Sequence, residues 1–309
     1  MSTPAPAATT TSYQAATQTA AWHRVTQPGV LRLSGATRVD YLQRQTTNDV
    51  GLLSPQRAVP SVLTNPSARI LEVFTLLQQD EHILLLTQPG HAPGLAAYFK
   101  RHLFFNDQVT IEDASAAWTQ IELYGPQVSG ALASLGFASQ PSTLDEVVTA
   151  TWQEHTLYAI QDEGCLRLLL PDGLSLPTEW ASLPELDLET RELLRIEAGR
   201  PGAPEFTDAY TPFEIGLGRY VSDTKGCYTG QEVLARQVTY DKVTRALAQL
   251  SSQQPLTAGE SVSLDGRTIG QVSSAAVSPA HGPMALAVLR KPFTAGDQVT
   301  ANGHPATIR

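Results

Sequence analysis

The sequence predicts an α+β protein with antiparallel sheets, followed by a small all-β domain at its C-terminal end. Two observations lead to this prediction. From about Trp22 onward, short strand-like segments joined by polar turns alternate with short segments at helical spacing. From about residue 243 the helical segments stop, and only short strand-like segments remain. Hairpins that alternate with helices are typical of antiparallel sheets covered by helices.

The hairpins and helices of the first part follow in a regular order. A strand and a helix open the series, and two hairpins turn at the polar QQDE and at Asp162-Glu163-Gly164. A proline near a helix start and a glycine after a helix end mark the limits of several helices. We expect strands at 29–35, 69–77, 82–87, 118–125, 156–161 and 165–170, and helices at 36–45, 93–104, 126–136 and 185–202.

The last part of the chain reads as a β-barrel or sandwich. Asp265-Gly266 and Asn302-Gly303 are dipeptides that favour tight hairpin turns. The chain's first 20 residues contain no Lys or Arg and no apolar run, which is typical of a disordered tail. The predicted organisation is therefore a disordered tail over 1–20, a mixed α+β region over 21–242, and a β-domain over 243–309.

Composition and charge argue against several classes of protein. The formal charge is −9, from 21 basic and 30 acidic residues, so direct nucleic-acid binding through bulk electrostatics is not expected. No apolar stretch approaches the ~18 residues of a membrane span, and no signal peptide is recognisable, so we expect a cytoplasmic protein without a membrane partner. The two cysteines, Cys165 and Cys227, lack the spacing of a metal site or a disulfide framework. Cys165 is expected to be a small core residue.

One acid lies on the apolar side of the helix expected at 185–202. Glu197 follows Leu193 by four residues and Leu194 by three, so it projects from the same side. Burying an unpaired charge is costly, so this carboxylate needs partners. It could form a structural ion pair, with neighbours of Arg195 or with a distant lysine. It could instead accept two hydrogen bonds from a flat ligand such as a pterin or guanine, and the residues leave both open.

The second cysteine lies in an unusual setting, TKGCYTGQEVLAR over 224–236. Thr229 and Glu232 fit a capping box, which would put Cys227 two residues before a helix N-terminus. The positive end of the helix dipole favours a thiolate there, and Lys225 adds a second positive charge. This pattern favours a reactive or ligand-facing cysteine over one that only fills a turn.

Two glycines, Gly226 and Gly230, flank this cysteine and would let backbone amides approach a ligand. A cysteine protease is not expected, because the seven histidines form no catalytic signature. GLGRYV over 216–221 begins like a dinucleotide-binding fingerprint but lacks the third glycine and a preceding strand, so we discard it.

The segment KGCYTGQEVLAR over 225–236 resembles the signature of the YgfZ family, folate-binding proteins related to the glycine-cleavage T-protein, an aminomethyltransferase. Supporting resemblance comes from YLQRQTTNDV (41–50), LLRIEAGRPG (193–202) and GRTIGQVSSAAVSP (266–279). Only the first 20 residues fall outside it. The resemblance implies a three-lobed, T-protein-like fold with two α+β lobes and a C-terminal β-barrel.

The resemblance also implies a ligand, partners and a site. Tetrahydrofolate or a derivative would be the cofactor, and Glu197 falls on the acid that hydrogen-bonds the pterin in T-proteins. The family maintains iron–sulfur enzymes, particularly radical enzymes that modify tRNA, so iron–sulfur enzymes or cluster-assembly proteins would be partners beside folate. Cys227 would be the reactive motif thiol. The other motif residues assigned to folate binding are Lys225, Gly226, Tyr228, Gly230, Gln231, Glu232 and Arg236.

One position departs from the T-protein pattern. T-proteins have an aspartate in the strand after LTN, and this chain has Glu72 there, in LTNPSARILEVF over 63–74. General-base geometry is sensitive to displacements of roughly 1 Å, and glutamate is one methylene longer. T-proteins also lack the cysteine motif. We therefore favour a folate-binding accessory protein over the alternative, a folate-dependent one-carbon transferase or demethylase with Glu72 as its base.

Overall fold

The structure is a computed structural model that describes residues 10–309, and it divides into two compact units. The first unit comprises the described residues up to Gln14 together with Leu186–Gly218 and Glu232–Arg309, and the second comprises Ala15–Glu185 and Arg219–Gln231. The chain therefore passes between the units more than once, and one passage lies inside the cysteine motif. Each unit has its own hydrophobic core.

The second unit contains two five-stranded antiparallel sheets. One has the strand order β3-β4-β5-β2-β6, and helices α2 and α3 pack on its outer face around the buried rings of Tyr41 and Phe99. Its elements are β2 (Gly29–Ser34), α2 (Arg38–Gln45), η1 (Val50–Leu52), β3 (Val59–Thr64), β4 (Ile70–Gln79), β5 (His82–Thr87), α3 (Ala92–Arg101) and β6 (Thr110–Asp113).

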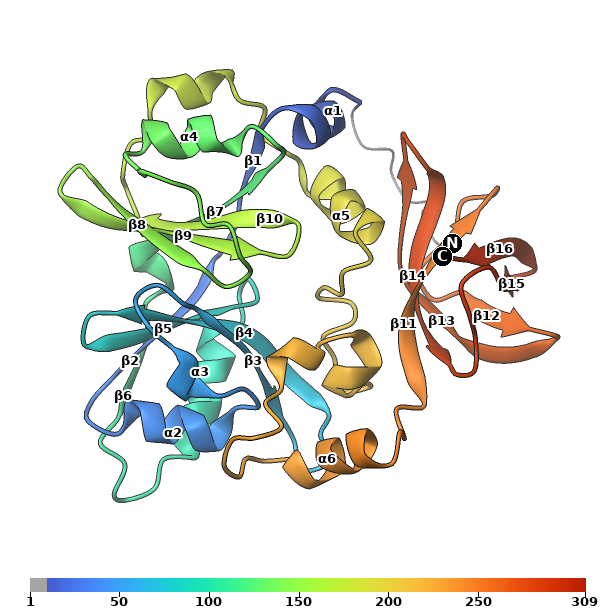
Figure 1. The fold of residues 1–309 in the computed structure, drawn as a ribbon, viewed down its shortest axis with the longest axis horizontal. Coiled ribbons are helices and arrows are strands. Elements are labelled where there is room, and N and C mark those ends of the chain that lie inside the picture. Colours follow the sequence, from blue (N-terminus) through green and yellow to red (C-terminus); the bar gives the residue numbers. More distant parts are fainter. Residues whose placement is uncertain (1–9) are drawn as a thin grey trace. The chain divides into compact units, whose positions relative to one another are not determined.

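The other sheet of this unit has the order β1-β7-β10-β9-β8, and helix α4 packs on its outer face. The inner faces of the two sheets share a core that includes Leu84, Trp118 and Tyr158, so the unit has four layers, helix, sheet, sheet and helix (Figure 1). The elements are β1 (Ala21–Arg24), η2 (Ser115–Ala117), β7 (Trp118–Tyr124), α4 (Val128–Ser134), β8 (Val147–Trp152), β9 (His155–Asp162), β10 (Cys165–Pro171) and η3 (Thr178–Ser182).

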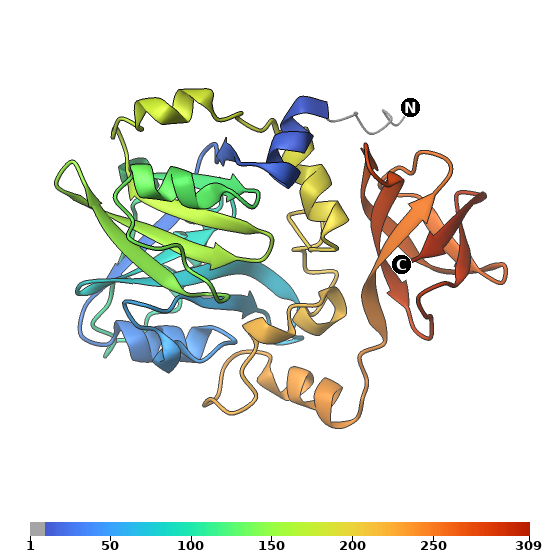
Figure 2. The ribbon, with the colours of Figure 1, turned by 45° about the horizontal axis from the view of Figure 1, so that its top comes forward.

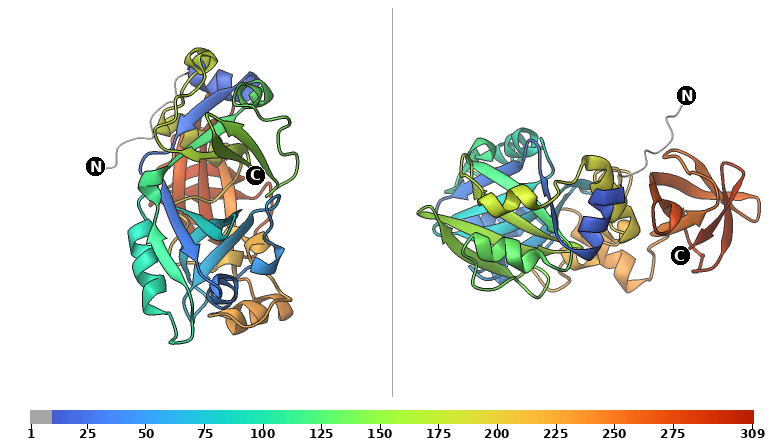
Figure 3. Two further views of the ribbon diagram at one scale, coloured as in Figure 1. Left: turned by 90° about the vertical axis from the view of Figure 1, so that its left-hand side faces the viewer. Right: turned by 90° about the horizontal axis from the view of Figure 1, so that it is seen from above.

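The first unit contains a closed antiparallel barrel of order β11-β14-β13-β12-β15-β16, drawn in orange and red in Figures 2 and 3. Asp265 and Asn302 adopt positive φ before their glycines, as the predicted hairpin turns require. The strands are β11 (Arg245–Ser252), β12 (Ser261–Leu264), β13 (Arg267–Ser278), β14 (Gly282–Arg290), β15 (Gln298–Ala301) and β16 (His304–Ile308). Between η3 and the barrel, the chain forms four further elements: α5 (Leu188–Glu197), η4 (Pro212–Ile215), η5 (Gly218–Tyr220) and α6 (Gln231–Thr239).

These elements confirm the predicted fold class, α+β with antiparallel sheets and a C-terminal barrel. The division at 242 and 243 stays a prediction, and the barrel strands begin at Arg245. None of the helices within residues 10–309 has both the length and the hydropathy of a membrane-spanning helix.

The N-terminal segment differs from the predicted disordered tail. Residues Thr10–Gln18 form helix α1, and two of its residues, Tyr13 and Ala16, are buried. The prediction of disorder over 1–20 is therefore wrong for this helix, while residues 1–9 lie outside the described residues. Packing of a few apolar side chains against distant elements outweighs the polar composition of the segment.

Candidate functional site

The cysteine motif begins with a buried lysine. Lys225 is 8% exposed, and its Nζ donates to the carbonyl oxygens of Thr46 at 2.6 Å and Asn48 at 2.8 Å, just after helix α2. Nζ also lies 5.2 Å from the ring centroid of Tyr228. Burial lowers the pKa of Lys225 to about 8, against the opposing influence of Asp49. The lysine thus fastens the motif to the segment that follows α2.

A tight turn fixes the motif a few residues later. Gly230 has φ of +88°, and a Cβ at this position would lie only 2.8 Å from the carbonyl oxygen of Asn65. The hydroxyl of Thr64 donates to the carbonyl oxygen of Thr229 at 2.6 Å. The turn therefore packs closely on the loop between β3 and β4, and the hydrogen bond from Thr64 joins it to the end of β3. Gly230 therefore serves this close backbone packing and the left-handed turn, which only glycine adopts without strain.

Between these two anchors the chain presents Cys227 to solvent. Cys227 is exposed, as is Gly226, while Lys225 and Tyr228 on either side are buried. A Cβ added to Gly226 would meet nothing within 4 Å. Burial raises the pKa of Tyr228 to about 12, so its phenol remains neutral at physiological pH. The result is an accessible thiol on a short segment that is held at both ends.

The end of the motif differs from the predicted capping box. Helix α6 begins at Gln231, so Gly230 rather than Thr229 precedes the helix. Gln231 Nε2 donates to the carbonyl oxygen of Lys225 at 3.4 Å, which closes the loop around Cys227. Glu232 and Arg236 form an exposed ion pair one helical turn apart, at 2.5 Å. The chain passes from one unit to the other between Gln231 and Glu232.

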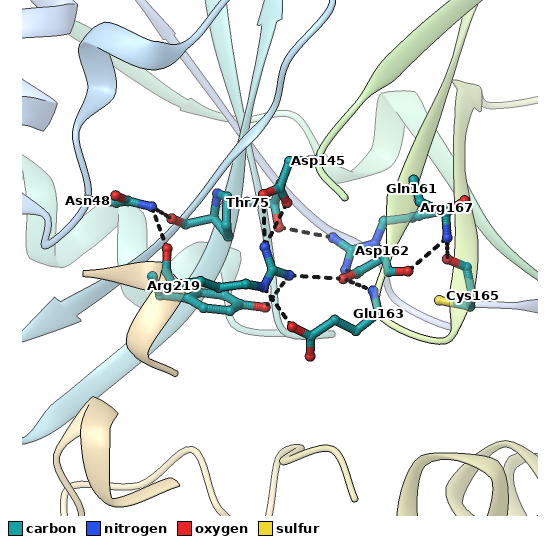
Figure 4. Close-up of polar contacts among 11 residues, drawn as sticks. Asn48, Thr75, Asp145, Gln161, Asp162, Glu163, Cys165, Arg167 and Arg219 are labelled. Carbon is teal, nitrogen blue, oxygen red and sulfur yellow. Dashed lines mark hydrogen bonds and ion pairs between the residues drawn. The ribbon is translucent and has the colours of Figure 1, made fainter. Parts of the chain in front are cut away.

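The sequence did not predict the ion-pair network around Arg219, which lies just before the cysteine motif (Figure 4). Arg219 Nη1 donates to both carboxylate oxygens of Asp145 at 2.9 Å, and its Nε donates to Glu163 at 2.7 Å. Its guanidinium lies 4.6 Å from the ring centroid of Tyr220. Arg167 pairs with Asp162 in the same network. The only signal in the sequence was an arginine beside an aromatic residue, in the glycine-rich stretch discarded above.

The backbone of this segment is also bound by the loop after α2. Asn48 Nδ2 donates to the carbonyl oxygen of Arg219 at 3.0 Å, and Thr47 Oγ1 donates to that of Tyr220 at 2.7 Å. The loop whose carbonyl oxygens bind the Lys225 ammonium therefore also binds the backbone of Arg219 and Tyr220, just before the motif. All of these contacts lie within the second unit.

The candidate pterin acid belongs to the first unit. Asp187 caps helix α5 by accepting from the backbone N–H of Thr190 at 2.7 Å, and Glu197 is the last residue of the helix. Glu197 Oε2 accepts a hydrogen bond from the hydroxyl of Tyr13 at 3.2 Å. Its Oε1 is buried and has no hydrogen-bond partner among the described residues. A buried polar oxygen without a donor is costly, so it marks a place where a ligand's donor would be favourable.

The neighbouring arginine does not pair with this acid. Arg195 is buried and donates to Glu205 at 3.0 Å, to Glu192 at 2.9 Å and to Ser274 of β13 at 2.8 Å. Its guanidinium thus belongs to a separate hydrogen-bond network, which joins α5 to the barrel. Of the two interpretations of Glu197, the orphaned oxygen favours the ligand acid over the structural ion pair.

Glu72 lies on β4, in the same unit as Cys227, opposite Leu63 of β3. Its side chain is buried, and Oε2 lies 2.7 Å from Nδ1 of His91, a half-exposed residue at the start of α3. Oε1 also accepts from the backbone N–H of Val73 at 3.2 Å. The carboxylate that would act as a base is therefore already hydrogen-bonded.

The structure thus separates the predicted residues into two groups. The second unit holds Glu72 and the motif as far as Gln231, while the first unit holds Glu197, Glu232 and Arg236. Within residues 10–309, no group of three or more His, Cys, Asp or Glu side chains could hold a metal ion.

Comparison with known proteins identifies the family. Residues 3–161 match the model of the GCVT N-terminal domain. A tRNA-modifying protein YgfZ of Colwellia psychrerythraea is 30% identical over 230 residues, which cover 73% of this chain and 69% of that protein. An aminomethyltransferase of a Nostoc species is 29% identical over 304 residues, 90% of this chain and 79% of that protein.

Two further comparisons bear on length and fold. A chloroplastic candidate transferase of Arabidopsis thaliana is 28% identical over 266 residues, and this chain spans 59% of its length. The crystal structure of the glycine cleavage system aminomethyltransferase T from Bartonella henselae superposes with a TM-score of 0.83 at 20% identity, covering 96% of this chain and 87% of that chain.

The fold and the family model define the class: this chain belongs to the GCVT family. Within that class it is similar to YgfZ, which confirms the resemblance that the cysteine motif predicted. The family match begins at residue 3, so the resemblance extends into the first 20 residues, where the sequence alone had not placed it. Helix α1 lies in this part of the chain.

Lys225 leads to a testable pH dependence of stability. Its pKa is about 8 in the folded protein against 10.5 for the free side chain, so between these values the unfolded chain binds more protons. The free energy of unfolding should therefore rise with pH across this window. Relative to Lys225→Met, we expect the parent to gain about 2 kcal/mol between pH 8 and 10 in urea unfolding. A difference between the two proteins that does not change with pH would contradict this assignment.

Proposed function

We propose that this protein binds tetrahydrofolate and supports the assembly or repair of iron–sulfur clusters in partner enzymes, including those that modify tRNA, with Cys227 as a reactive thiol. The observation that carries the folate part is the orphaned Oε1 of Glu197, buried at the end of α5. A pterin edge carries two adjacent N–H donors, which a carboxylate can bind as a charge-assisted pair. The residues present therefore fit the ligand that the family resemblance implies.

The proposed roles of the residues follow from their settings. Glu197 would hold the pterin edge, and tetrahydrofolate, when bound, supplies a carrier of one-carbon units. Cys227 is exposed on a segment anchored by Lys225 and Gly230, and access is one of the properties that a reactive thiol requires. The YgfZ relative, whose name describes it as tRNA-modifying, supports the choice of partner enzymes.

The proposal is tested by calorimetric titration of tetrahydrofolate into the purified protein without oxygen. We expect saturable binding at micromolar concentrations. The second half of the test uses cells that lack the protein. The activity of tRNA-modifying iron–sulfur enzymes should be lower in these cells, and expression of the parent chain should restore it. Absence of folate binding would remove the folate role, and unchanged cluster enzymes would remove the accessory role.

The aminomethyltransferase relatives keep a second function open, the transfer of a one-carbon unit from the folate. The observation that favours it is the buried carboxylate of Glu72, held by His91. A carboxylate of this kind can act as a general base when a substrate reaches it.

Glu72→Gln separates the two functions, because it keeps the shape of the side chain and removes its basicity. We expect the variant to support iron–sulfur enzymes in cells as well as the parent does. Incubation of the parent with methylenetetrahydrofolate and glycine or sarcosine derivatives, followed by mass spectrometry, would report any one-carbon product. A product made by the parent and lost in Glu72→Gln would favour the transferase.

A further inference from the structure

A tyrosine from the N-terminal helix contacts the candidate pterin acid. Tyr13 lies on α1, and its hydroxyl donates to Glu197 Oε2 at 3.2 Å, across 184 positions of the sequence. Both residues belong to the same unit. Each carboxylate oxygen accepts two hydrogen bonds, so among the described residues this contact leaves one acceptor site on Oε2 and both on Oε1.

The position of the tyrosine is set by packing. Tyr13 is 8% exposed, and its ring belongs to an apolar cluster with side chains of α5 and of the barrel. The cluster consists of Tyr13, Leu193, Ile196, Ala276, Met284 and Leu286. Burial and the neighbouring carboxylate of Glu197 raise the pKa of the Tyr13 phenol, so it keeps its proton at neutral pH. The hydroxyl is therefore a fixed donor.

The backbone next to the acid is fixed as well. Gln249 of β11 donates from Nε2 to the carbonyl oxygens of Ile196 at 2.6 Å and Glu197 at 2.9 Å. These oxygens lie in the last turn of α5, where carbonyl groups lack partners within the helix. The end of the helix is thus held by the barrel, and Tyr13 then orients the carboxylate that the helix presents.

We propose that Tyr13 is a positioning residue for ligand binding by Glu197, and that helix α1 is therefore part of the binding machinery. Its hydrogen bond to Oε2 orients the carboxylate so that the orphaned Oε1 receives one N–H of the ligand and the free site on Oε2 receives the other. The ligand class is a planar heterocycle with adjacent ring and exocyclic N–H groups. This inference rests on the proposed folate function.

Tyr13→Phe tests the proposal, because phenylalanine keeps the ring in the cluster and removes only the donor. We expect the Kd for tetrahydrofolate to rise about tenfold by calorimetry. Tyr240→Phe makes the same chemical change at an exposed position and should bind like the parent.

A second measurement needs no folate. NMR titration of ring-labelled tyrosine should show that the pKa of Tyr13 falls in Glu197→Gln, since the carboxylate charge is lost. An unchanged titration would show that the contact does not form, and would overturn the proposal. The proposal would also be overturned if the parent binds tetrahydrofolate and Tyr13→Phe binds it with the same Kd. If the parent itself does not bind tetrahydrofolate, the proposed function falls and this inference falls with it.

Discussion

Glu197→Gln is expected to weaken tetrahydrofolate binding by about 100-fold or more. The substitution preserves the size of the side chain but replaces one acceptor oxygen by an NH₂ group and removes the negative charge. The two N–H donors of a pterin edge would then face one acceptor, the amide oxygen, and one donor, the NH₂ group. One of the two pterin N–H groups would therefore lose its hydrogen bond. Losing a charge-assisted hydrogen bond in a buried site costs about 3 kcal/mol, which corresponds to about two orders of magnitude in Kd.

Calorimetry of the parent and the variant at one pH and one salt concentration measures this effect. Glu189→Gln is the matched control, because Glu189 is exposed on the first turn of the same helix. It makes the same chemical change and should leave the Kd unaltered. Thermal unfolding of all three proteins checks that the helix is intact. If Glu197→Gln still binds with the affinity of the parent, the pterin edge is held elsewhere and this assignment is wrong.

Cys227→Ser is expected to abolish the support of iron–sulfur enzymes in cells while leaving the fold and folate binding unchanged. Serine has nearly the size of cysteine, and Cys227 is exposed, so the anchors at Lys225 and Gly230 should persist. A serine hydroxyl, however, does not ionise near neutral pH and is a far weaker nucleophile and metal ligand than a thiolate. The loss should therefore be chemical and not structural.

The measurement is the activity of a tRNA-modifying iron–sulfur enzyme in cells whose only copy of the protein is the variant. We expect activity no higher than in cells that lack the protein. Cys165→Ala provides the comparison, because Cys165 is the other cysteine and is buried in β10. That variant should retain the function. Full activity with Cys227→Ser would rule out the thiol, and a parallel loss of folate binding would indicate a structural role for it.

The sequence predicted the position of the acid but not its partner. The spacing from Leu193 and Leu194 placed Glu197 on the packed side of its helix, and the structure puts it at the end of α5 with one buried oxygen. Tyr13 could not be predicted, because nothing local in the chain links two residues 184 positions apart. The same reason explains the missed helix α1, whose polar composition gave no sign of the distant apolar surfaces that cover Tyr13.

The cysteine motif shows a related limit. Spacing alone suggested that Lys225 supplies charge to the thiol, whereas its Nζ donates to carbonyl oxygens that follow α2, 177 and 179 positions earlier in the chain. A local pattern reports which residue types stand together but not which loop packs over them. Arg219 was missed for that reason, since its partners Asp145 and Glu163 come from other elements of the second unit.

The turn at Gly230 has a consequence for how such signatures vary in evolution. A residue with a Cβ cannot occupy this position without moving the loop of Asn65, whatever reaction the protein supports, whereas the exposed position of Cys227 carries no such constraint. If Cys227 acts as the proposed thiol, relatives without thiol chemistry should therefore replace the cysteine first and keep the glycine. A glycine at this position in a distant sequence would indicate the same loop packing. Only the cysteine would indicate the same function.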